Sequence, residues 1–326
     1  VTTNANSGTG SMRRTLQEAC PGDTITFDAG LAVSTITLTS GELNLVKDVV
    51  ITNPNAPGLA IDGNNNSRVF NIDNGVSAEI QDLTIANGMD ANGGGIQNNG
   101  NLALWRCKIS NNESLGNGGG LFSDNGTTIE IYNCTFADNI ASGDGGGFYA
   151  DQATPTVSGS TINNNEATNG GGCVTNEGDF VNCTFSANTA TNDFNQIVET
   201  DTAQLAHCTI TNGTGASNNL SGSFVVNHTI IYGNSGAIGG TLNASFSVIE
   251  GGATGAGNLD IDPLLETLAD NGGETQTHAL SECSPIIDAG DSAISSAPAT
   301  DQRGMTRIAD GTNSGQAIID LSLIHI

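Results

Sequence analysis

Positive charge is scarce in this chain of 326 residues, which has 8 Lys and Arg residues against 34 Asp and Glu residues and a net charge of -26. Such an acidic surface repels nucleic acid phosphates and anionic membrane surfaces, so we expect neither as a partner. Nor does any stretch approach the ~20 apolar residues that span a bilayer. The charge is typical of a protein that stays soluble outside a cell. The chain opens at Val1, so we expect any signal peptide to have been removed or left out.

Aromatic residues are also rare, and paired cysteine motifs are missing. Aromatic residues make up 4% of the chain and there are three methionines, which argues against a large conventional core filled by rings. The seven cysteines are an odd number, so at least one is unpaired, and no two form a CxxC pair. Zinc sites and thioredoxin-like redox sites therefore lack their usual signature. We expect no cofactor other than a structural calcium ion.

Glycine is abundant, at 44 residues, and a repeat places it regularly. Triple glycines begin at Gly93, Gly118, Gly145 and Gly170, which are 25, 27 and 25 residues apart. A second motif, of the type CTFADN, keeps nearly the same spacing and contains one apolar anchor per copy. These anchors are Ile85, Ile109, Phe136, Ile162, Phe185, Ile210 and Ile230. Self-similarity at a period of about 20 to 50 residues indicates a solenoid, a propeller or an array.

The pattern within each copy selects one of these architectures. Apolar and polar residues alternate in TTIEIYNCTF, which is strand periodicity, and no stretch inside the repeats shows a helical face. A propeller blade needs ~40 residues, and the leucine framework of a leucine-rich repeat is missing. We therefore predict an all-β chain that forms a single right-handed parallel β-helix. In this solenoid each coil stacks on the previous one at ~4.8 Å.

The chain divides into four parts on this interpretation. Residues 1–22 form an N-terminal cap, with a short helix that begins after Ser11 and lies across the first coil. Residues 23–258 form the repeats. Residues 259–320, where turns and prolines predominate, form irregular final coils and a C-terminal cap, because a solenoid must cover its end coils. Residues 321–326, LSLIHI, match a translated sequencing adapter and are a candidate non-native tail; the alternative is an apolar strand that closes the last coil.

Stacking predicts that like positions form columns along the coil. One column points inward and contains the residue that opens each copy: Leu83, Cys107, Cys134, Ser160, Cys183, Cys208 and His228. We expect its cysteines to be small buried hydrophobic residues in the reduced form, because neighbours on adjacent coils usually lack disulfide geometry. A second column is an asparagine ladder at a corner, where each amide bonds the coils above and below. Its members are Asn112, Asn139, Asn165 and Asn188.

A third column faces outward and is rich in threonine. Its members are Thr84, Lys108, Thr135, Thr161, Thr184, Thr209 and Thr229. Threonine suits an exposed strand because of its β propensity, which by itself explains the column. The alternative is a flat hydroxyl array that orders water or binds a sugar surface. The candidate ligand-binding residues on that hypothesis are Thr135, Thr161, Thr184 and Thr209.

Acidic turns are the candidates for a structural calcium site. One oxygen-rich turn contains Asp144, and four further aspartates lie in turns of the C-terminal part. These are Asp260, Asp262, Asp288 and Asp291. None of the turns matches the nonapeptide calcium repeat of secreted β-rolls. Arg303 lies among Asp288, Asp291 and Asp301, so we also expect a partly buried structural ion pair there.

With these features the chain resembles bacterial cell-surface β-helix proteins with polymorphic outer-membrane-type repeats. The resemblance rests on the paired motifs GGG(I/L/F) and (C/S)(T/K)(I/F)xxN between Gly93 and Asn188, and on the opening SGTGSMRRTLQEACPGDTITFD. The tail, with DPLLETLADNGGETQTHAL, SPIIDAGD and TDQRG, is similar to the choice-of-anchor Q region. The resemblance implies export and display at the cell surface through a C-terminal sorting signal, which is not visible here. It implies no catalytic residues, because the family has none agreed.

Three functions stay open from the residues. The first is a non-enzymatic adhesin or stalk, secreted or at the cell surface, that binds an extracellular glycan or a host or neighbouring cell through its lateral faces. The second is a structural subunit that associates with itself end to end into extracellular fibres. The third is a polysaccharide lyase or hydrolase of the pectate-lyase-like type. No catalytic equipment is visible for it, since Arg106 and Lys108 have one carboxylate nearby, at Asp82, where a calcium site needs a cluster.

Overall fold

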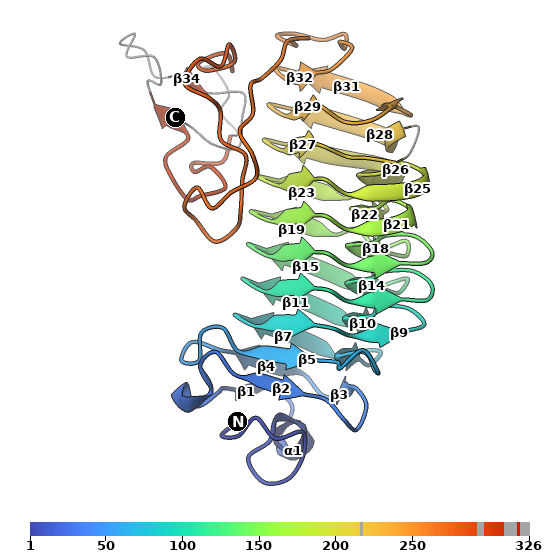
Figure 1. The fold of residues 1–326 in the computed structure, drawn as a ribbon, viewed down its shortest axis with the longest axis vertical. Helices are drawn as coiled ribbons and strands as arrows, with labels where there is room; N and C mark the ends of the chain where they lie inside the picture. The colour runs from blue at the N-terminus through green and yellow to red at the C-terminus, as the bar shows by residue number, and fades with distance from the viewer. Residues whose placement is uncertain (216–217, 292–296, 310–317, 320–326) are drawn as a thin grey trace.

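The computed structural model describes residues 1–215, 218–291, 297–309 and 318–319. It confirms the predicted fold class, an all-β right-handed parallel β-helix. Among the described residues the single α-helix is α1 (Met12–Glu18), near the N-terminus. In Figure 1 the coils stack along the long axis of the molecule, with α1 below the first coil and the C-terminal residues, orange to red, beside the stack.

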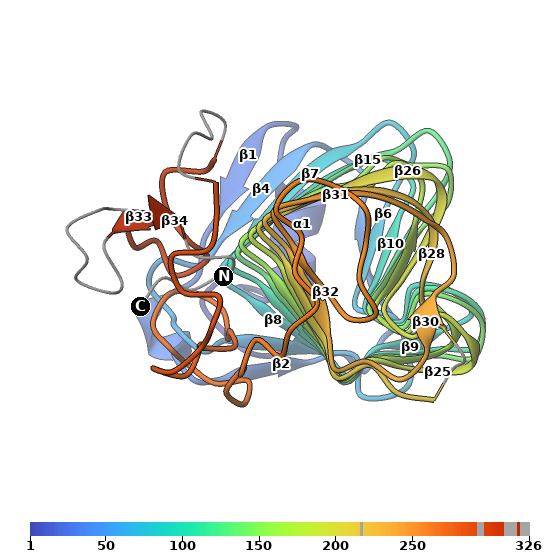
Figure 2. The same cartoon turned by 90° about the horizontal axis from the view of Figure 1, so that it is seen from above.

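Sheet A is the largest sheet and forms two faces of the coil (Figure 2). Two sets of strands contribute to it, and the long strands β26 and β28 belong to both. The strands of sheet A are β1 (Asp23–Ile25), β3 (Leu43–Leu45), β4 (Val49–Thr52), β6 (Phe70–Ile72), β7 (Ser77–Gln81), β10 (Ile96–Asn98), β11 (Asn101–Trp105), β14 (Leu121–Ser123), β15 (Thr128–Tyr132), β18 (Phe148–Ala150), β19 (Thr156–Ser158), β22 (Cys173–Thr175), β23 (Asp179–Val181), β26 (Ile197–Ala206), β28 (Asn218–Asn227), β30 (Ala237–Ile238) and β31 (Thr241–Ser245).

Sheets B and C complete each coil. The strands of sheet B are β2 (Thr35–Thr37), β5 (Ala60–Asp62), β8 (Thr84–Ala86), β12 (Lys108–Ser110), β16 (Thr135–Ala137), β20 (Thr161–Asn163), β24 (Thr184–Ser186), β27 (Thr209–Thr211), β29 (Ile230–Tyr232) and β32 (Val248–Ile249). The shorter sheet C contains β9 (Met89–Asp90), β13 (Glu113–Ser114), β17 (Ile140–Ala141), β21 (Glu166–Asn169) and β25 (Thr189–Asp193). Outside the coil lie a 3-10 turn, η1 (Ala29–Leu31), and the antiparallel pair β33 (Ile308–Ala309) and β34 (Ile318–Ile319).

The core is a set of vertical files of apolar side chains inside the coil. In sheet B the anchors pair strand to strand in register and are completely buried: Ile85, Ile109, Phe136, Ile162, Phe185 and Ile210. Each anchor therefore removes apolar surface of its neighbours on the coils above and below from water. Seven of the ten phenylalanines are buried in this core together with the aliphatic side chains: Phe27, Phe70, Phe136, Phe148, Phe180, Phe185 and Phe224.

Between the sixth and the seventh copy of the repeat, the observed strand pairing differs by one residue from the predicted one. Ile210 pairs with Ile231, the residue after the expected anchor. As a consequence Cys208 lies beside Thr229 in the inward column, and its backbone N–H donates to Thr229 Oγ1 at 3.1 Å. The placement of His228 in that column, and of Thr229 in the outward one, is therefore wrong. Side chains alternate along a strand, so a slip of one residue moves each of them to the other face.

A corner residue with positive φ precedes each inward residue of sheet B. This corner column contains Asp82, Arg106, Asn133, Gly159, Asn182, His207, His228 and Phe246. At Gly159 a Cβ atom would lie 2.1 Å from Asn133 Oδ1, so a larger residue there would require the Asn133 side chain to move. Asparagine, aspartate and histidine tolerate this backbone region better than most residues. His207 and His228 share the corner, where their rings stack with centroids 5.0 Å apart.

The C-terminal part lies mainly beside the coil. Residues 263–291 and 297–309, here called the C-terminal strap, run back along the outer face of sheet B (Figures 1 and 2). Thr161 Oγ1, for example, donates to the carbonyl oxygen of Gln276, 115 residues later, at 2.6 Å. The last coil is covered by the turn before the strap, where Asn258 Nδ2 donates to the carbonyl oxygen of Ala244 at 2.9 Å. The expected C-terminal cap is thus for the most part a lateral cover.

Helix α1 closes the other end of the coil. Ser11 is its N-cap and accepts the N–H of Arg14 through its side chain at 3.3 Å. Met12 and Leu16 are buried on one face. Lys47 ties the end of the helix to the coil by donating to the carbonyl oxygen of Ala19 at 2.7 Å. No helix in the described ranges is long and apolar enough to cross a membrane.

Candidate functional site

The threonine column is not an open hydroxyl array. Thr135 is partly exposed, but Thr161, Thr184 and Thr209 are completely buried. The strap covers this part of sheet B, and Thr184 Oγ1 donates to Gln302 Oε1 at 2.9 Å. The expectation of an exposed column is wrong for these three threonines, because their cover comes from a distant part of the chain that has no repeat pattern.

The candidate calcium ligands are dispersed. Asp260 and Asp262 each accept a nearby backbone N–H, at 3.1 and 2.9 Å. Asp288 and Asp291 lie in a later turn of the strap, where the backbone N–H of Asp291 donates to His228 Nε2 at 3.1 Å. No group of three or more His, Cys, Asp and Glu side chains that could hold a metal occurs within the described residues. A structural calcium ion at these turns stays a prediction.

The inward cysteines are buried neighbours within the core. The backbone N–H of Cys107 donates to Cys134 Sγ at 3.4 Å, and Ser160 separates Cys134 from Cys183. All seven cysteines of the chain are free thiols. Burial raises the pKa of the Cys134 and Cys183 thiols well above the ordinary value. They therefore serve as packing groups, since nucleophilic cysteines need the thiolate form.

The four ladder asparagines form a continuous buried chain of hydrogen bonds. From Asn112 to Asn188, each Nδ2 donates to the Oδ1 of the next ladder residue, at 2.9, 2.9 and 3.0 Å. Each of these Oδ1 atoms also accepts the backbone N–H of the previous ladder residue, at 3.1, 3.0 and 3.0 Å. Asn188 Nδ2 ends the ladder on Gln196 Oε1 at 2.6 Å. The ladder thereby satisfies turn backbone that is buried away from water.

One carboxyl group lies inside the coil. Glu199 on β26 is 5% exposed; the Thr175 hydroxyl donates to its Oε1, and the N–H of Gly178 donates to its Oε2 at 3.4 Å. Burial is the main cause that raises the pKa of Glu199 to about 7, and the two hydrogen bonds oppose it. Sequence reasoning missed this residue, because the alternation of β26 is interrupted by a register shift between Val198 and Thr202.

The outer face of sheet A presents partly exposed aromatic side chains. Trp105 on β11 and Tyr132 on β15 occupy the same register position on adjacent coils, with ring centroids 4.1 Å apart and ring planes at 26°. Both point away from the core, since the residues before them, Leu104 and Ile131, are completely buried. Sequence reasoning missed this pair. The repeat alignment that places Cys107 and Cys134 in one column would also have placed these two residues together.

A second aromatic pair lies on the other of the two coil faces that sheet A forms, the face that contains β14 and β18. Phe122 on β14 and Tyr149 on β18 stack with ring centroids 5.4 Å apart and planes at 3°. Gln97, Asn71 and Asn44 continue the same register column toward the N-terminus. The column thus places amide groups and aromatic rings along one line, one residue for each coil.

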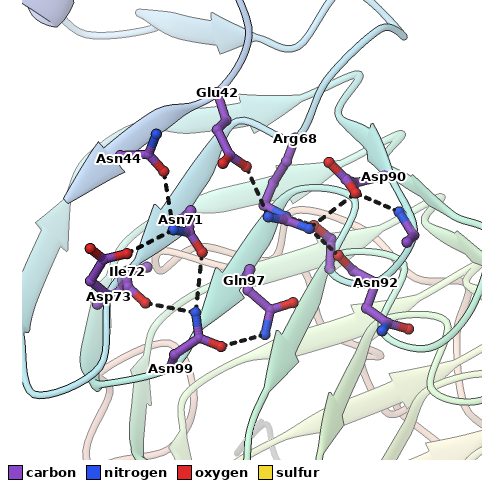
Figure 3. Close-up of polar contacts among 12 residues, drawn as sticks. Glu42, Asn44, Arg68, Asn71, Ile72, Asp73, Asp90, Asn92, Gln97 and Asn99 are labelled. Carbon is purple, nitrogen blue, oxygen red and sulfur yellow. Dashed lines mark hydrogen bonds and ion pairs between the residues drawn. The ribbon is translucent and has the colours of Figure 1, made fainter. Parts of the chain in front are cut away.

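Figure 3 shows the amide end of this column. Asn71 Nδ2 donates to Asn44 Oδ1 at 3.0 Å, and Asn99 Nδ2 donates to Asn71 Oδ1 at 3.2 Å. Gln97 Nε2 in turn donates to Asn99 Oδ1 at 2.9 Å. The first two hydrogen bonds join adjacent coils and the third lies within one coil, and together they hold the amides in fixed orientations.

Arg68 lies beside the amides (Figure 3). Its guanidinium group is 2.8 Å from Glu42 Oε2 and 3.2 Å from Asp90 Oδ1, and it donates to the carbonyl oxygens of Asn92 and Gly93 at 3.0 Å each. Two carboxylates therefore neutralise this cation, and this part of the face attracts anions weakly.

A groove of about 340 Å³ crosses the beginning of the strands whose ends carry Trp105 and Tyr132. Val50 and Ala103 form its small apolar floor. Its polar lining residues are Asp48, Ser77, Glu79, Asn101, Thr128 and Glu130. The groove therefore offers hydroxyl, amide and carboxylate groups next to an aromatic pair.

A cleft between sheet B and the strap contains the basic residues considered for an enzyme. Lys108 and Glu274 line two adjoining hollows of about 370 and 310 Å³. In the part of the chain that the structure describes, the Lys108 ammonium group has no hydrogen bond or ion pair. Arg106 instead donates to both carboxylate oxygens of Asp82, at 2.7 and 2.9 Å. This pairing raises the pKa of Arg106 and so disfavours a role for it as a proton acceptor.

Comparison with known proteins supports the architecture. The family model of the right handed beta helix region matches residues 34–212, more than half of the chain. No curated protein matches the chain. Among solved structures, the crystal structure of pectate lyase Pel9A is similar, at 14% sequence identity and a TM-score of 0.46, over 100% of this chain and 95% of that chain. A likeness at this level carries no argument about activity.

Proposed function

The chain belongs to the right-handed β-helix family, and on that premise we propose that it is a non-enzymatic protein that binds glycans through the outer face of sheet A. We place it outside the cell, secreted or at the cell surface, where it acts as an adhesin or a stalk. The acidic composition supports this location, since a net charge of -26 keeps an extended rod soluble. The family alone does not decide the function, because function lives in the sites that a fold carries.

The observation that carries the proposal is the stacked pair Trp105 and Tyr132 above the polar groove. An aromatic face has negative charge density and attracts the polarised C–H groups of a sugar ring. Hydroxyl, amide and carboxylate groups such as Ser77, Asn101 and Glu130 can then hydrogen-bond to the sugar hydroxyls. A binding site commonly combines apolar rings with a few polar groups that fix the ligand's orientation.

The charge of this face selects the class of glycan. Glu79 and Glu130 face outward on either side of Ala103, and Asp48 lies at the edge of the groove. The residues that line the groove include no lysine or arginine. Anionic polysaccharides are therefore repelled, whereas neutral chains are accepted. Because rungs repeat at ~4.8 Å, a ligand that contacts three coils spans about 10 Å, or at least two sugar rings.

The single tryptophan of the chain makes the test direct, because Trp105 lies on the proposed face. Neutral oligosaccharides selected on a glycan array should change its fluorescence in a saturable way. Tyr132→Ala should weaken binding at least tenfold, about 1.4 kcal/mol, because buried aromatic anchors dominate such contacts. Thr135→Ala, on sheet B, is the matched control and should bind like the wild type. Equal affinity of both variants, or loss only in Thr135→Ala, would overturn the proposal.

A carbohydrate-active enzyme is the second candidate, and the observation that favours it is the unpaired Lys108 in the cleft beside Glu274. A lysine ammonium group that makes no ion pair is available to contact a bound saccharide. The test is a panel of acidic and neutral polysaccharides with Lys108→Ala as the comparison. Turnover by the wild type that disappears in this variant would replace the non-enzymatic proposal.

A further inference from the structure

The strap covers side chains that would otherwise face water. Thr161, Thr184 and Ser186 stand on the outer side of sheet B, yet their exposed fractions are 0%, 0% and 2%. On β20 and β24 the coil does not need this cover for its own core, whose apolar side chains lie on the inner side of the same strands, whereas on β29 and β32 the strap also covers the outward-facing Ile230 and Val248. The strap therefore hides a face that the coil could present to solvent.

The contacts between strap and coil combine hydrogen bonds with an apolar cluster near the last coils. Gln302 inserts its carboxamide between two coils: Nε2 donates to Thr161 Oγ1 at 3.0 Å, and Oε1 accepts from Thr184 at 2.9 Å. Thr275 Oγ1 donates to the carbonyl oxygen of Gly159 at 2.8 Å. The hydrogen-bonded part of the contact, over β20 and β24, can open at modest cost, because water replaces each hydrogen bond that is lost. The apolar part consists of the buried residues Ile230, Val248, Leu280 and Ile286, against which Tyr232, Phe246, Leu259, Leu265, Ile287 and Ala289 pack.

All three histidines among the described residues lie at this contact. His278 Nδ1 faces the carbonyl oxygen of Glu266 at 2.7 Å, so this nitrogen must be the donor. His278 Nε2 is then the acceptor for the Ser186 hydroxyl at 2.9 Å. His228 Nε2 accepts the backbone N–H of Asp291, which belongs to the strap, at 3.1 Å. The His228 ring is therefore neutral, because its Nε2 can only accept from this N–H, and a neutral His278 ring uses Nε2 in the same way toward Ser186.

We propose that the C-terminal strap is an acid-released cover, which closes the sheet B face at neutral pH and uncovers its threonine column in acid. A proton added to His228 Nε2 removes the acceptor of the Asp291 N–H and so breaks that tie. A proton added to His278 Nε2 turns this nitrogen into a donor, so the Ser186 hydroxyl must reverse its hydrogen bond, and the strap then covers a buried cation. The strap thus depends on histidines that stay unprotonated.

The groups that face these histidines set the direction of the response. Burial lowers the pKa of all three, that of His207 to about 2. The Arg307 guanidinium, on the strap, adds to the lowering at His207 and His228. The Asp291 carboxylate opposes it at His228, and the carbonyl of Glu266 opposes it at His278. Burial exceeds these opposing effects in each case, so the closed strap excludes protons.

The sign of the effect follows from linkage. A released histidine takes up a proton near its ordinary pKa of about 6.5, whereas the closed form does not. The closed form is therefore fully favoured above that pH, and its advantage falls up to tenfold per pH unit and per histidine below it. At pH 5.0 each histidine shifts the balance toward the released form by up to about 30-fold.

Hydrogen–deuterium exchange of the full chain, corrected for the intrinsic effect of pH, tests the proposal. Strap peptides around Thr277 and Gln302 should exchange at least 30-fold more readily at pH 5.0 than at pH 7.5. Peptides from β11 and β15 should keep their protection. Equal strap protection at the two pH values would overturn the proposal, and so would simultaneous loss of protection in strap and coil, which is global unfolding.

Two variants identify the titrating groups. His228→Gln with His278→Gln keeps an acceptor in each position but cannot take up a proton, so most of the acid response should disappear. Gln302→Ala loosens the strap without removing a histidine, so exchange should rise at both pH values with the acid response unchanged. A full acid response in the double glutamine variant would show that carboxylates control the strap and would refute the histidine mechanism. Circular dichroism checks that each variant keeps its strands.

Discussion

Replacement of one ladder residue, Asn139→Ala, offers the sharpest check of the stacked-coil description. Asn139 is completely buried, and its side chain makes four hydrogen bonds. Oδ1 accepts the backbone N–H and the Nδ2 of Asn112 at 3.1 and 2.9 Å. Nδ2 donates to the carbonyl oxygen of Ile109 at 3.0 Å and to Asn165 Oδ1 at 2.9 Å. Alanine removes all four, and water has no access to replace them.

The expected loss follows from this count. At a net value of about 1 kcal/mol for each hydrogen bond, four lost bonds lower the free energy of unfolding by about 4 kcal/mol. With an m-value of about 2 kcal/mol per molar urea, the midpoint should fall by about 2 M. Asn125→Ala is the matched control, since Asn125 is exposed in a turn, and its effect should stay within about 0.5 kcal/mol.

The assay is urea unfolding followed by far-ultraviolet circular dichroism and by the fluorescence of Trp105, which lies in the neighbouring coil. Agreement between the two signals shows whether the coils unfold as one unit. If Asn139→Ala and Asn125→Ala have the same midpoint, the ladder contributes nothing, and the idea that it supports the buried turns must be abandoned.

Two further measurements address the inside of the coil. Between pH 4.5 and pH 7 the Glu199 carboxyl keeps its proton in the folded state but loses it in the unfolded state. The contribution of Glu199 to the free energy of unfolding should therefore fall by about 3 kcal/mol as the pH rises from 4.5 to 7, and it should stay constant above pH 7. The difference between wild type and Glu199→Gln at each pH separates this effect from the opposite one of the histidines, and a constant difference would contradict it. Thiol titration without reductant should find two reactive groups in the native protein, the exposed Cys20 and Cys283, and seven after denaturation, whereas a smaller final number would reveal a disulfide.

The coil itself was predictable from the sequence, because its physical cause is local and repeated. Every lap places an apolar residue, a small inward residue and an asparagine in the same environment, so the same letters recur at nearly constant spacing. Asn112 and Asn139 lie 27 residues apart in sequence, yet they share a hydrogen bond of 2.9 Å. Periodicity detects relations of this kind directly.

The incorrect predictions concern the parts of the chain where the regular repeat ends. The copy at His228 could be aligned in two ways, since Ile230 and Ile231 both fit an apolar anchor. The corner column decides between them, because His207 and His228 both adopt positive φ, a backbone property that the letters do not display. The strap was beyond prediction for a different reason. Contacts such as Thr184 with Gln302 join one repeat to one irregular segment, so the sequence contains no repeated pattern that could predict them.

The sequence pattern did not predict the candidate site, because the most regular outward column is the threonine column of sheet B and the site lies on sheet A. Threonine repeats along sheet B, whereas the aromatic pairs of sheet A each occupy only two coils. Trp105 with Tyr132, and Phe122 with Tyr149, are local departures from the repeat. In a solenoid the regular positions maintain the stack, and the exceptions on an exposed face are the better candidates for recognition.

The corner column has a consequence for how this protein can change in length. Each bend is formed by one residue of its own lap, and the next lap begins from the same geometry. If one complete coil were inserted between Asn139 and Asn165, it would present to the next coil the same stacking surface that the present coil offers. The rod can therefore be lengthened or shortened in discrete increments of about 4.8 Å, and the distance between its two ends becomes a quantity that duplication and deletion can adjust.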